Sequence, residues 1–513
     1  MSLRSLLSWV SCEVAAAKVI VLMCGFERLM IFARNQDVES SNEPNPHPRE
    51  DYLRKTSNGR PVKLRYSFCI LALFAATLAA QTPKSSPATE PDARFKADVL
   101  LVVAHPDDET GVSAYLAQLL DQHKRVAAVY LTHGEAGHNN MGPERAISLG
   151  AVREMELRQA MTKVGVENVW FLDGRDTPSQ NVLQSLANWH NGAALEEVVR
   201  MVRLTRPEVI LTWLPGFFIG ENHGDHQASG VLATEAFDTA GDPSVFPAQL
   251  ASPVRVNETL LEGLRAWQPK KIYYFSDAQE QDQFKNTGPE YPTTGISPTR
   301  KMPYWRIAME AFEFHLTQYR SYIEGLKKKD EQEQAKDWAD PVQLTFGKSN
   351  VAGSATGDVF EGVTPGEIAY VRRVEEVQAP PSGLSMELAG PWGFYETFRP
   401  AHGFQHLPKA TVPEIAIAWG ATLEIPLLLR NNTASQQEVI LSTTMPEGWA
   451  TQQGTGSYSL RAGDQLPVLI TAVAPTSSER KLDEIICDAK AGGQTIATIK
   501  LHVKLRSGGL PQN

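Results

Sequence analysis

Apolar runs and amphipathic segments alternate between residue 97 and about residue 275. The run Val99–Val103 is typical of a central parallel strand that is buried on both faces. Comparable patterns predict strands at 98–103, 126–132, 168–172, 208–213 and 271–275 and helices at 110–122, 144–164 and 193–205. This alternation predicts a Rossmann-like α/β fold, a parallel sheet with helices on both faces.

The second half of the chain has a different pattern. Residues 276–303 are rich in turn residues, and Arg306–Lys336 predicts one long helix with a charged end. We treat 338–407 as a connecting region without assigned elements. From 408 to 505, short strands separated by turn residues predict a C-terminal β-sandwich, with strands at 415–418, 423–429, 438–442, 466–473, 484–489 and 495–503.

The N-terminal hundred residues differ in kind. Residues 1–61 include a polar stretch without periodicity, which predicts disorder or a wrongly assigned translation start. Residues 62–81 combine basic residues, an apolar run and small residues before Gln81, as a secretory signal peptide does. Residues 82–96 then form a linker. We therefore expect a periplasmic or secreted protein; the alternative is a membrane anchor that is not cleaved.

Composition narrows the function classes. A chain of 513 residues predicts two or three domains, and a net charge of −10 without a dense Lys/Arg stripe argues against a nucleic-acid partner. Three of the four cysteines lie in or before the signal segment, so no disulfide is expected in the mature chain, where Cys487 is a buried small hydrophobe. No G-x-G-x-x-G follows the first strand, which excludes nicotinamide and flavin binding.

Two polar clusters follow predicted strands. His105, Asp107, Asp108 and Glu109 come directly after the first strand, and His223-Gly224-Asp225-His226 comes after the strand at 208–213. Ligand sites in open α/β sheets lie at the carboxyl ends of strands, so these clusters are expected to converge. Two imidazoles and a carboxylate with one open position are typical of a catalytic Zn²⁺ site.

These motifs resemble a known family. Ala104-His105-Pro106-Asp107-Asp108-Glu109, taken with His223-Gly224-Asp225-His226, is similar to the PIG-L/LmbE-like zinc-dependent de-N-acetylases. That family includes enzymes that deacetylate N-acetylglucosaminyl-phosphatidylinositol and N-acetylglucosaminyl-inositol. The resemblance covers roughly 97–320 and includes His315-x-x-Gln318, which places the deacetylase domain at 97–337.

The resemblance also implies roles for individual residues. His105, Asp108 and His226 would hold one Zn²⁺ or another divalent metal, and Asp107 would be the general base. His223 would stabilise the oxyanion, and Asp225 would orient an imidazole from outside the ligand set. Arg153 and Asp176 are candidates for substrate contacts; a surface salt bridge and a turn are the structural alternatives. Glu109 is expected to favour the following helix N-terminus.

A second, shorter resemblance concerns the predicted sandwich. Pro446-Glu447-Gly448-Trp449 followed by Leu460-Arg461-Ala462-Gly463 resembles immunoglobulin-like domains appended to bacterial secreted glycosidases. It implies an accessory module that contacts cell-envelope polysaccharide.

We therefore expect a zinc-dependent hydrolase that removes an N-acetyl group from an amino sugar or glycoconjugate. One alternative is a metal-dependent amidase acting on another amide, such as a thiol-sugar conjugate. The other is a non-catalytic secreted carbohydrate-binding protein.

Overall fold

The computed structural model describes residues 91–216, 223–250, 263–276, 281–372, 381–409, 412–478, 480 and 482–506. The predicted disordered segment 1–61 and the predicted signal peptide 62–81 lie outside these residues, as does most of the predicted linker. Within the described part of the chain, no helix has both the length and the apolar character needed to cross a membrane.

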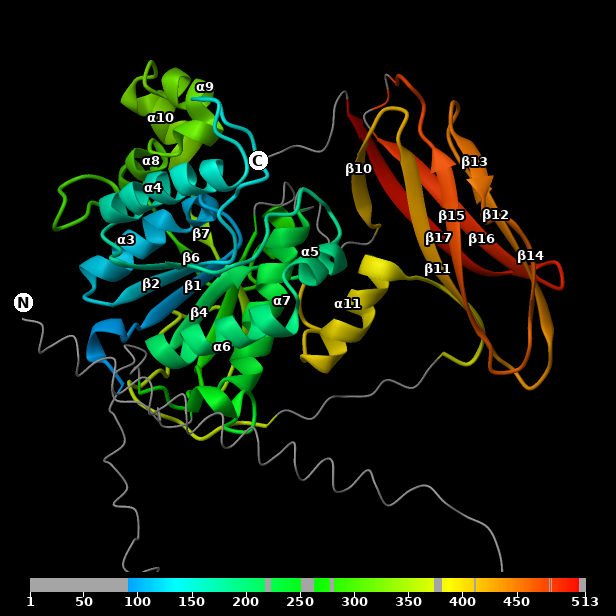
Figure 1. Cartoon of the computed structure of the whole chain (residues 1–513), viewed down its shortest axis with the longest axis horizontal. Helices are drawn as coiled ribbons and strands as arrows, with labels where there is room; N and C mark the ends of the chain where they lie inside the picture. Colours follow the sequence, from blue (N-terminus) through cyan, green and yellow to red (C-terminus); the bar gives the residue numbers. More distant parts are fainter. Residues whose placement is uncertain are drawn as a thin grey trace, which may run out of the picture. The chain divides into compact units, whose positions relative to one another are not determined.

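A six-stranded sheet forms the centre of the α/β part (Figure 1). Its strand order is β3-β2-β1-β4-β5-β8, and its strands are β1 (Val99–Val103), β2 (Val126–Tyr130), β3 (Asn168–Phe171), β4 (Val209–Trp213), β5 (Lys271–Phe275) and β8 (Thr345–Ser349). All pairs are parallel except β5 with β8. The predicted parallel sheet is confirmed, with an added antiparallel edge strand.

Helices cover both faces of this sheet, as predicted (Figure 1). Val99, Leu101 and Val103 of β1 pack in one apolar cluster, and Leu100 and Val102 pack in another on the opposite face. The first cluster includes residues of α3 (Ser113–Asp121), α4 (Ile147–Val164) and α8 (Tyr304–Phe312), and the second includes residues of α5 (Val182–Asn188), α6 (Gly192–Thr205) and α7 (Gly224–Thr239). The apolar run of β1 thus reflects burial on both faces.

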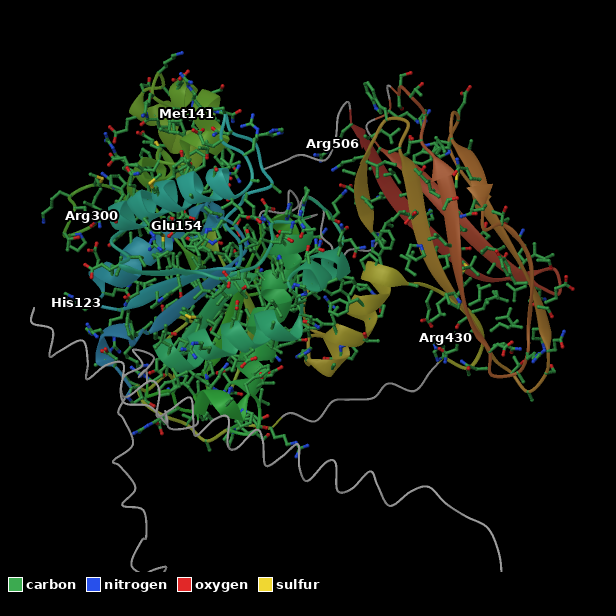
Figure 2. All side chains as sticks on the ribbon, viewed as in Figure 1. His123, Met141, Glu154, Arg300, Arg430 and Arg506 are labelled. Atoms are coloured by element: carbon green, nitrogen blue, oxygen red, sulfur yellow. The ribbon has the colours of Figure 1, made fainter. Side chains whose placement is uncertain are left out.

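Arg300, labelled in Figure 2, secures the end of α4. Its guanidinium donates to the carbonyl of Val164 at 2.8 Å and also to that of Lys163. The last carbonyls of a helix lack intrahelical donors and carry partial negative charge. A cation from the loop before α8 therefore satisfies them.

The single long helix predicted at 306–336 is wrong. The structure has three helices there: α8, α9 (Leu316–Leu326) and α10 (Glu331–Trp338). His315 separates α8 from α9. Its side chain contacts buried Glu109 at 2.7 Å, and its backbone leaves the helical region. Asp330 starts α10 through a capping box with Glu333. Side-chain contacts produce both interruptions of the predicted helix, and the apolar periodicity of the sequence does not reveal such contacts.

The segment treated as connecting, 338–407, supplies several elements. It contains β7 (Val342–Gln343), which pairs with β6 (Glu290–Tyr291), and β8 at the edge of the α/β sheet. It also contains α11 (Gly390–Ala401), whose Tyr395 and Phe398 belong to the same apolar cluster as α6 and α7. Short 3₁₀ turns complete the α/β part: η1 (Ala93–Phe95), η2 (Asp108–Gly111), η3 (Pro247–Leu250) and η4 (Gln281–Phe284).

The C-terminal part is a β-sandwich, as predicted. Two sheets, β10-β17-β16-β12-β14 and β13-β15-β11-β9, share one apolar core that includes Ile425, Ile470 and Ile485. The strands are β9 (Gly383–Leu388), β10 (Glu414–Ala418), β11 (Thr422–Asn432), β12 (Gln437–Thr444), β13 (Ala450–Gln453), β14 (Gly456–Leu460), β15 (Gln465–Val473), β16 (Asp483–Ala491) and β17 (Gln494–Arg506). Cys487 is buried, as expected.

Candidate active site

The turn after β1 places the first polar cluster. The chain turns at Asp107, which has φ 143° and ψ −16°, and η2 begins at the next residue. A positive φ of this kind is strained for a residue with a side chain, and such strain gathers at functional sites. The turn buries His105, Asp107 and Asp108 together at the end of the central strand.

Asp108 is held by one of its two carboxylate oxygens. Its Oδ2 accepts hydrogen bonds from the backbone N–H groups of Ala104 (2.8 Å) and His105 (2.9 Å) and from the indole N–H of Trp213 (2.6 Å). Its Oδ1 lies 3.2 Å from Nε2 of His226 and 3.6 Å from Nδ1 of His105. The carboxylate thus presents one oxygen to two imidazoles.

The second motif lies at the start of α7, after β4. His223 is the N-cap residue, and its Nδ1 accepts the backbone N–H of Asp225 at 3.3 Å. Gly224 packs so closely that a Cβ would lie 2.8 Å from Oγ of Ser185 and 2.9 Å from the backbone of Asn181. Glycine therefore lets the start of α7 approach the loop before α5, which brings both histidines to the end of β1.

Three imidazoles gather at this point. The ring centroid of His105 lies 4.7 Å from that of His223 and 5.1 Å from that of His226. One ring nitrogen from each lies within 4.8 Å of the others. Trp213 stacks on His226 with ring centroids 4.3 Å apart and fixes its plane.

Two further carboxylates contact His105 from the opposite side. Its Nε2 lies 3.3 Å from Oδ2 of Asp225 and 3.4 Å from Oδ1 of Asp176. Backbone N–H groups hold both acids, that of Thr177 on Asp225 (2.8 Å) and that of Ala136 on Asp176 (2.9 Å). A carboxylate on one ring nitrogen orients a histidine whose other nitrogen binds a metal.

The donor set fits a zinc ion. Nδ1 of His105 is buried and accepts no hydrogen bond from the described residues, and it faces Oδ1 of Asp108. Ligands about 2.0–2.2 Å from a tetrahedral zinc lie roughly 3.3–3.6 Å from one another. The distance from Asp108 Oδ1 to His105 Nδ1 (3.6 Å) lies at the upper end of this range, and the distance to His226 Nε2 (3.2 Å) lies just below it.

The surroundings of the two adjacent aspartates shift their pKa values in opposite directions. Burial, with the charge of Asp108, raises the pKa of Asp107 to about 6. Burial also opposes ionisation of Asp108, but the charges of His226 and His105 outweigh it and hold the pKa of Asp108 well below its usual range. Adjacent carboxylates with separated pKa values suit one metal ligand and one proton acceptor.

The remaining imidazole stays neutral in this setting. Burial lowers the pKa of His223 well below its ordinary value, and nearby His105 and His226 act in the same direction. Because Nδ1 accepts a backbone N–H, the ring proton of neutral His223 sits on Nε2. His223 is therefore a hydrogen-bond donor.

The two proposed substrate contacts are both buried. Asp176 joins the cluster through its contact with His105. Burial alone would raise the pKa of Asp176, but the hydrogen bond with His105 outweighs burial and lowers this pKa to about 2. Arg153 forms no salt bridge with a described residue; it donates to the carbonyls of Gly134 (2.6 Å) and His138 (2.9 Å). Arg153 thus holds the loop beside the turn, and a substrate contact for either residue stays a prediction.

Sequence reasoning missed several residues of this centre. Trp213 holds Asp108, and Glu109 is not a simple helix-end charge: it is buried and contacts His315 (2.7 Å) and Tyr130 (3.1 Å). The hydroxyl of Tyr319 donates to Oδ2 of Asp107 at 2.8 Å. His315-x-x-Gln318 was the only sequence signal near this contact.

Comparison with known proteins supports the family suggested by the motifs. Residues 100–237 match the family model described as "PIG-L: GlcNAc-PI de-N-acetylase". This part of the chain is thus similar to the PIG-L family. The matched PIG-L segment begins in β1 and ends within α7, so it includes both clusters.

Relatives of the PIG-L segment carry a common name. A 1D-myo-inositol 2-acetamido-2-deoxy-alpha-D-glucopyranoside deacetylase of Streptomyces scabiei is 35% identical over 182 residues, which are 32% of this chain and 56% of that protein. A protein of the same name from Thermobifida fusca is 28% identical over 241 residues, 43% of this chain and 82% of that protein. The chain spans little more than half the length of several such relatives, 56–60%.

Solved structures also match. The N,N'-diacetylchitobiose deacetylase of Pyrococcus horikoshii is 17% identical, with a TM-score of 0.35, over 56% of this chain and 93% of that chain.

Proposed function

We propose that the PIG-L domain is a metal-dependent hydrolase that removes the N-acetyl group from an amino sugar or glycoconjugate. The observation that carries this proposal is the contrast between two adjacent acids. Asp108 turns one oxygen to two imidazoles, whereas Asp107 has a pKa of about 6 and contacts Tyr319 instead. This contrast supports a role for Asp108 as a metal ligand and for Asp107 as the group that exchanges protons near neutral pH.

His105, Asp108 and His226 would hold the metal, for which Zn²⁺ is the first candidate. A zinc ion bound by three protein ligands lowers the pKa of a bound water to about 7 and polarises a carbonyl. Asp225 and Asp176 keep Nε2 of His105 occupied, so the ring presents Nδ1 to Asp108.

The other residues move protons and stabilise charge. Asp107 takes a proton from the attacking water and passes it to the departing amine, which needs a proton to leave. His223 donates its Nε2 proton to the oxyanion that develops on the acetyl carbonyl oxygen. Losing such a donor typically reduces the rate by about 10²–10³.

Acetate release by the purified protein tests this function. The substrates would be a panel of N-acetylglucosamine, its inositol conjugate and short N-acetylated oligosaccharides, each assayed with zinc and with a chelator. We expect turnover of at least one sugar, loss of activity with chelator, and recovery when zinc is added back. Asp107→Ala should be inactive, and Asp173→Ala, which alters an exposed acid in a nearby loop, should match the wild type. Failure of every substrate with zinc present, or full activity of Asp107→Ala, contradicts the proposal.

Export of the protein is also a proposal, supported by the pattern at 62–81. N-terminal sequencing of the native protein would give a start near residue 82 after signal cleavage. A native protein that begins at or before residue 61 and stays bound to membranes would favour the anchor instead.

We propose that the sandwich is an accessory module that contacts cell-envelope polysaccharide. Its described residues include no group of three metal-binding side chains, and Trp419 exposes 40% of its surface. Exposed aromatic rings are common in surfaces that bind ligands. Deleting 408–513 should spare turnover of small substrates and remove binding to insoluble envelope polysaccharide. A folded truncate that has lost all small-substrate turnover would contradict an accessory role.

A further inference from the structure

The first turn of α9 is tied to the turn that carries the two aspartates. Nε2 of Gln318 donates to the carbonyl of Pro106 at 2.6 Å, and the hydroxyl of Tyr319 donates to Asp107 at 2.8 Å. His315 contacts Glu109 at 2.7 Å. Three side chains of one helical turn thus meet three residues of a turn about 200 positions earlier in the chain.

The same helical turn is fixed from behind by α4. Glu156 accepts the backbone N–H of Thr317 at 2.9 Å and its hydroxyl at 2.6 Å. Thr317 and His315 are fully buried. The backbone that carries Tyr319 therefore has few ways to move without breaking buried hydrogen bonds.

Both partners of the Tyr319–Asp107 hydrogen bond leave regular backbone geometry. Asp107 has the strained positive φ of 143°. Tyr319 interrupts α9 with φ −126° and ψ 23°. A strained residue persists only where its surroundings determine it, so the contacts around Asp107 hold it in place.

We propose that Tyr319 is a positioning residue for Asp107. This inference rests on the proposed function of Asp107 as the group that exchanges protons. The Tyr319 hydroxyl binds Oδ2, and no described residue donates to Oδ1, so Oδ1 is left to face the water and the departing amine. Without the hydroxyl, the carboxylate rotates about its side-chain bonds and loses its alignment.

The charge balance of the pair suits this role. The charge of Asp107, together with burial, raises the pKa of Tyr319 well above its ordinary value. The phenol therefore stays protonated and acts as a donor. Tyr319 acts through Asp107 and takes no proton from the substrate.

Tyr319→Phe tests the proposal, because it removes only the hydroxyl. Tyr322→Phe is the matched control: it lies on the same helix, its ring also packs against Phe312, and its side chain is 45% exposed. For both variants we would measure kcat, KM, bound zinc and melting temperature, and solve a crystal structure.

We expect kcat of Tyr319→Phe to fall by about 10- to 100-fold, as for a misplaced catalytic group. KM and zinc content should stay within about twofold of the wild type, since the substrate and metal contacts are unchanged. In the crystal structure the Asp107 carboxylate should occupy more than one position. Tyr322→Phe should match the wild type in every measurement.

The crystal structure makes the result independent of the proposed function. If Asp107 keeps a single, unchanged position in Tyr319→Phe, the positioning role is wrong, whatever the kinetics show. An unchanged kcat with a displaced Asp107 also overturns it. If the wild type turns over no substrate, the proposed function fails, whereas a displaced Asp107 still supports the positioning contact.

Discussion

The indole Nε1 of Trp213 lies 2.6 Å from Oδ2 of Asp108. The same ring stacks on His226, so one side chain orients two of the three proposed ligands. Trp213 is the last residue of β4, which pairs with β1, the strand that leads into Asp108. The pairing of β4 with β1 therefore places Trp213 beside the turn that carries Asp108.

Trp213→Phe should weaken zinc binding by about 10- to 100-fold, the usual effect of removing a partner that orients a ligand. Phenylalanine keeps an aromatic ring beside His226 but cannot donate to Asp108. A competition titration with a chromogenic chelator measures the change. Trp267→Phe is the control, because its indole donates to the carbonyl of Pro207 at 2.7 Å and is equally buried. Equal zinc affinities for the two variants would contradict this role.

The variants Asp107→Asn and Asp108→Asn should distinguish the proposed roles of the two acids as base and as metal ligand. Asparagine nearly preserves shape and removes the charge, so Asp107→Asn should lose about 10²–10⁴ in kcat with its zinc content intact. Asp108→Asn should lose zinc under mild chelation, since an amide is a poor zinc ligand. Metal analysis after dialysis, paired with kcat at saturating zinc, distinguishes them. Loss of zinc from Asp107→Asn would show that it is a ligand rather than the base.

Glu109→Ala should destabilise the domain by about 3–5 kcal/mol, because it leaves buried His315 without its partner. Thermal and urea unfolding would measure this loss. Tyr130→Phe, which removes the longer 3.1 Å hydrogen bond to Glu109, should cost only about 1 kcal/mol. A stability equal to that of the wild type in Glu109→Ala would mean that Glu109 serves the helix N-terminus alone, as the sequence suggested.

The position of Asp108 could be predicted from the sequence, whereas the contact made by Tyr319 could not. Asp108 and His226 follow strands whose apolar runs are clear, and parallel neighbours bring their carboxyl ends together. The five parallel strands of the α/β sheet were therefore predictable, and so was the meeting of the two motifs, whereas the antiparallel edge strand β8 was not. Tyr319 lies 212 positions from Asp107, inside a segment whose periodicity predicted an unbroken helix. Nothing local marks a tyrosine that meets a distant aspartate.

In the sandwich, too, only some of the strands could be predicted from the sequence. Its inner faces alternate with exposed residues in β11, so that strand was predictable. In contrast, β13 has no buried residue and β9 precedes α11 in the chain, outside the strand-rich region. Strands without apolar alternation, or separated from their sheet by a helix, give no periodic signal.

Asp238→Asn should lower stability at neutral pH, because Asp238 joins three elements. From α7 it contacts Nδ1 of His402 after α11 at 2.7 Å, and it pairs with Lys348 of β8. Although burial opposes ionisation, the hydrogen bond from His402 and the charge of Lys348 lower the pKa of Asp238. Breaking one side of a buried ion pair typically costs about 3–5 kcal/mol.

The pH dependence of this loss follows from the sign of the shift. A lowered pKa in the folded state stabilises the protein above the unfolded value, about 3.9 for an aspartate, and the contribution disappears as the pH falls through the folded value. The melting temperatures of Asp238→Asn and the wild type should therefore differ at pH 7 and converge below about pH 4. Glu396→Gln, which removes an exposed pair with Lys409, should change stability by less than about 1 kcal/mol at pH 7. A difference for Asp238→Asn that persists unchanged at acid pH would mean that packing, rather than the ionised carboxylate, holds α11 to α7.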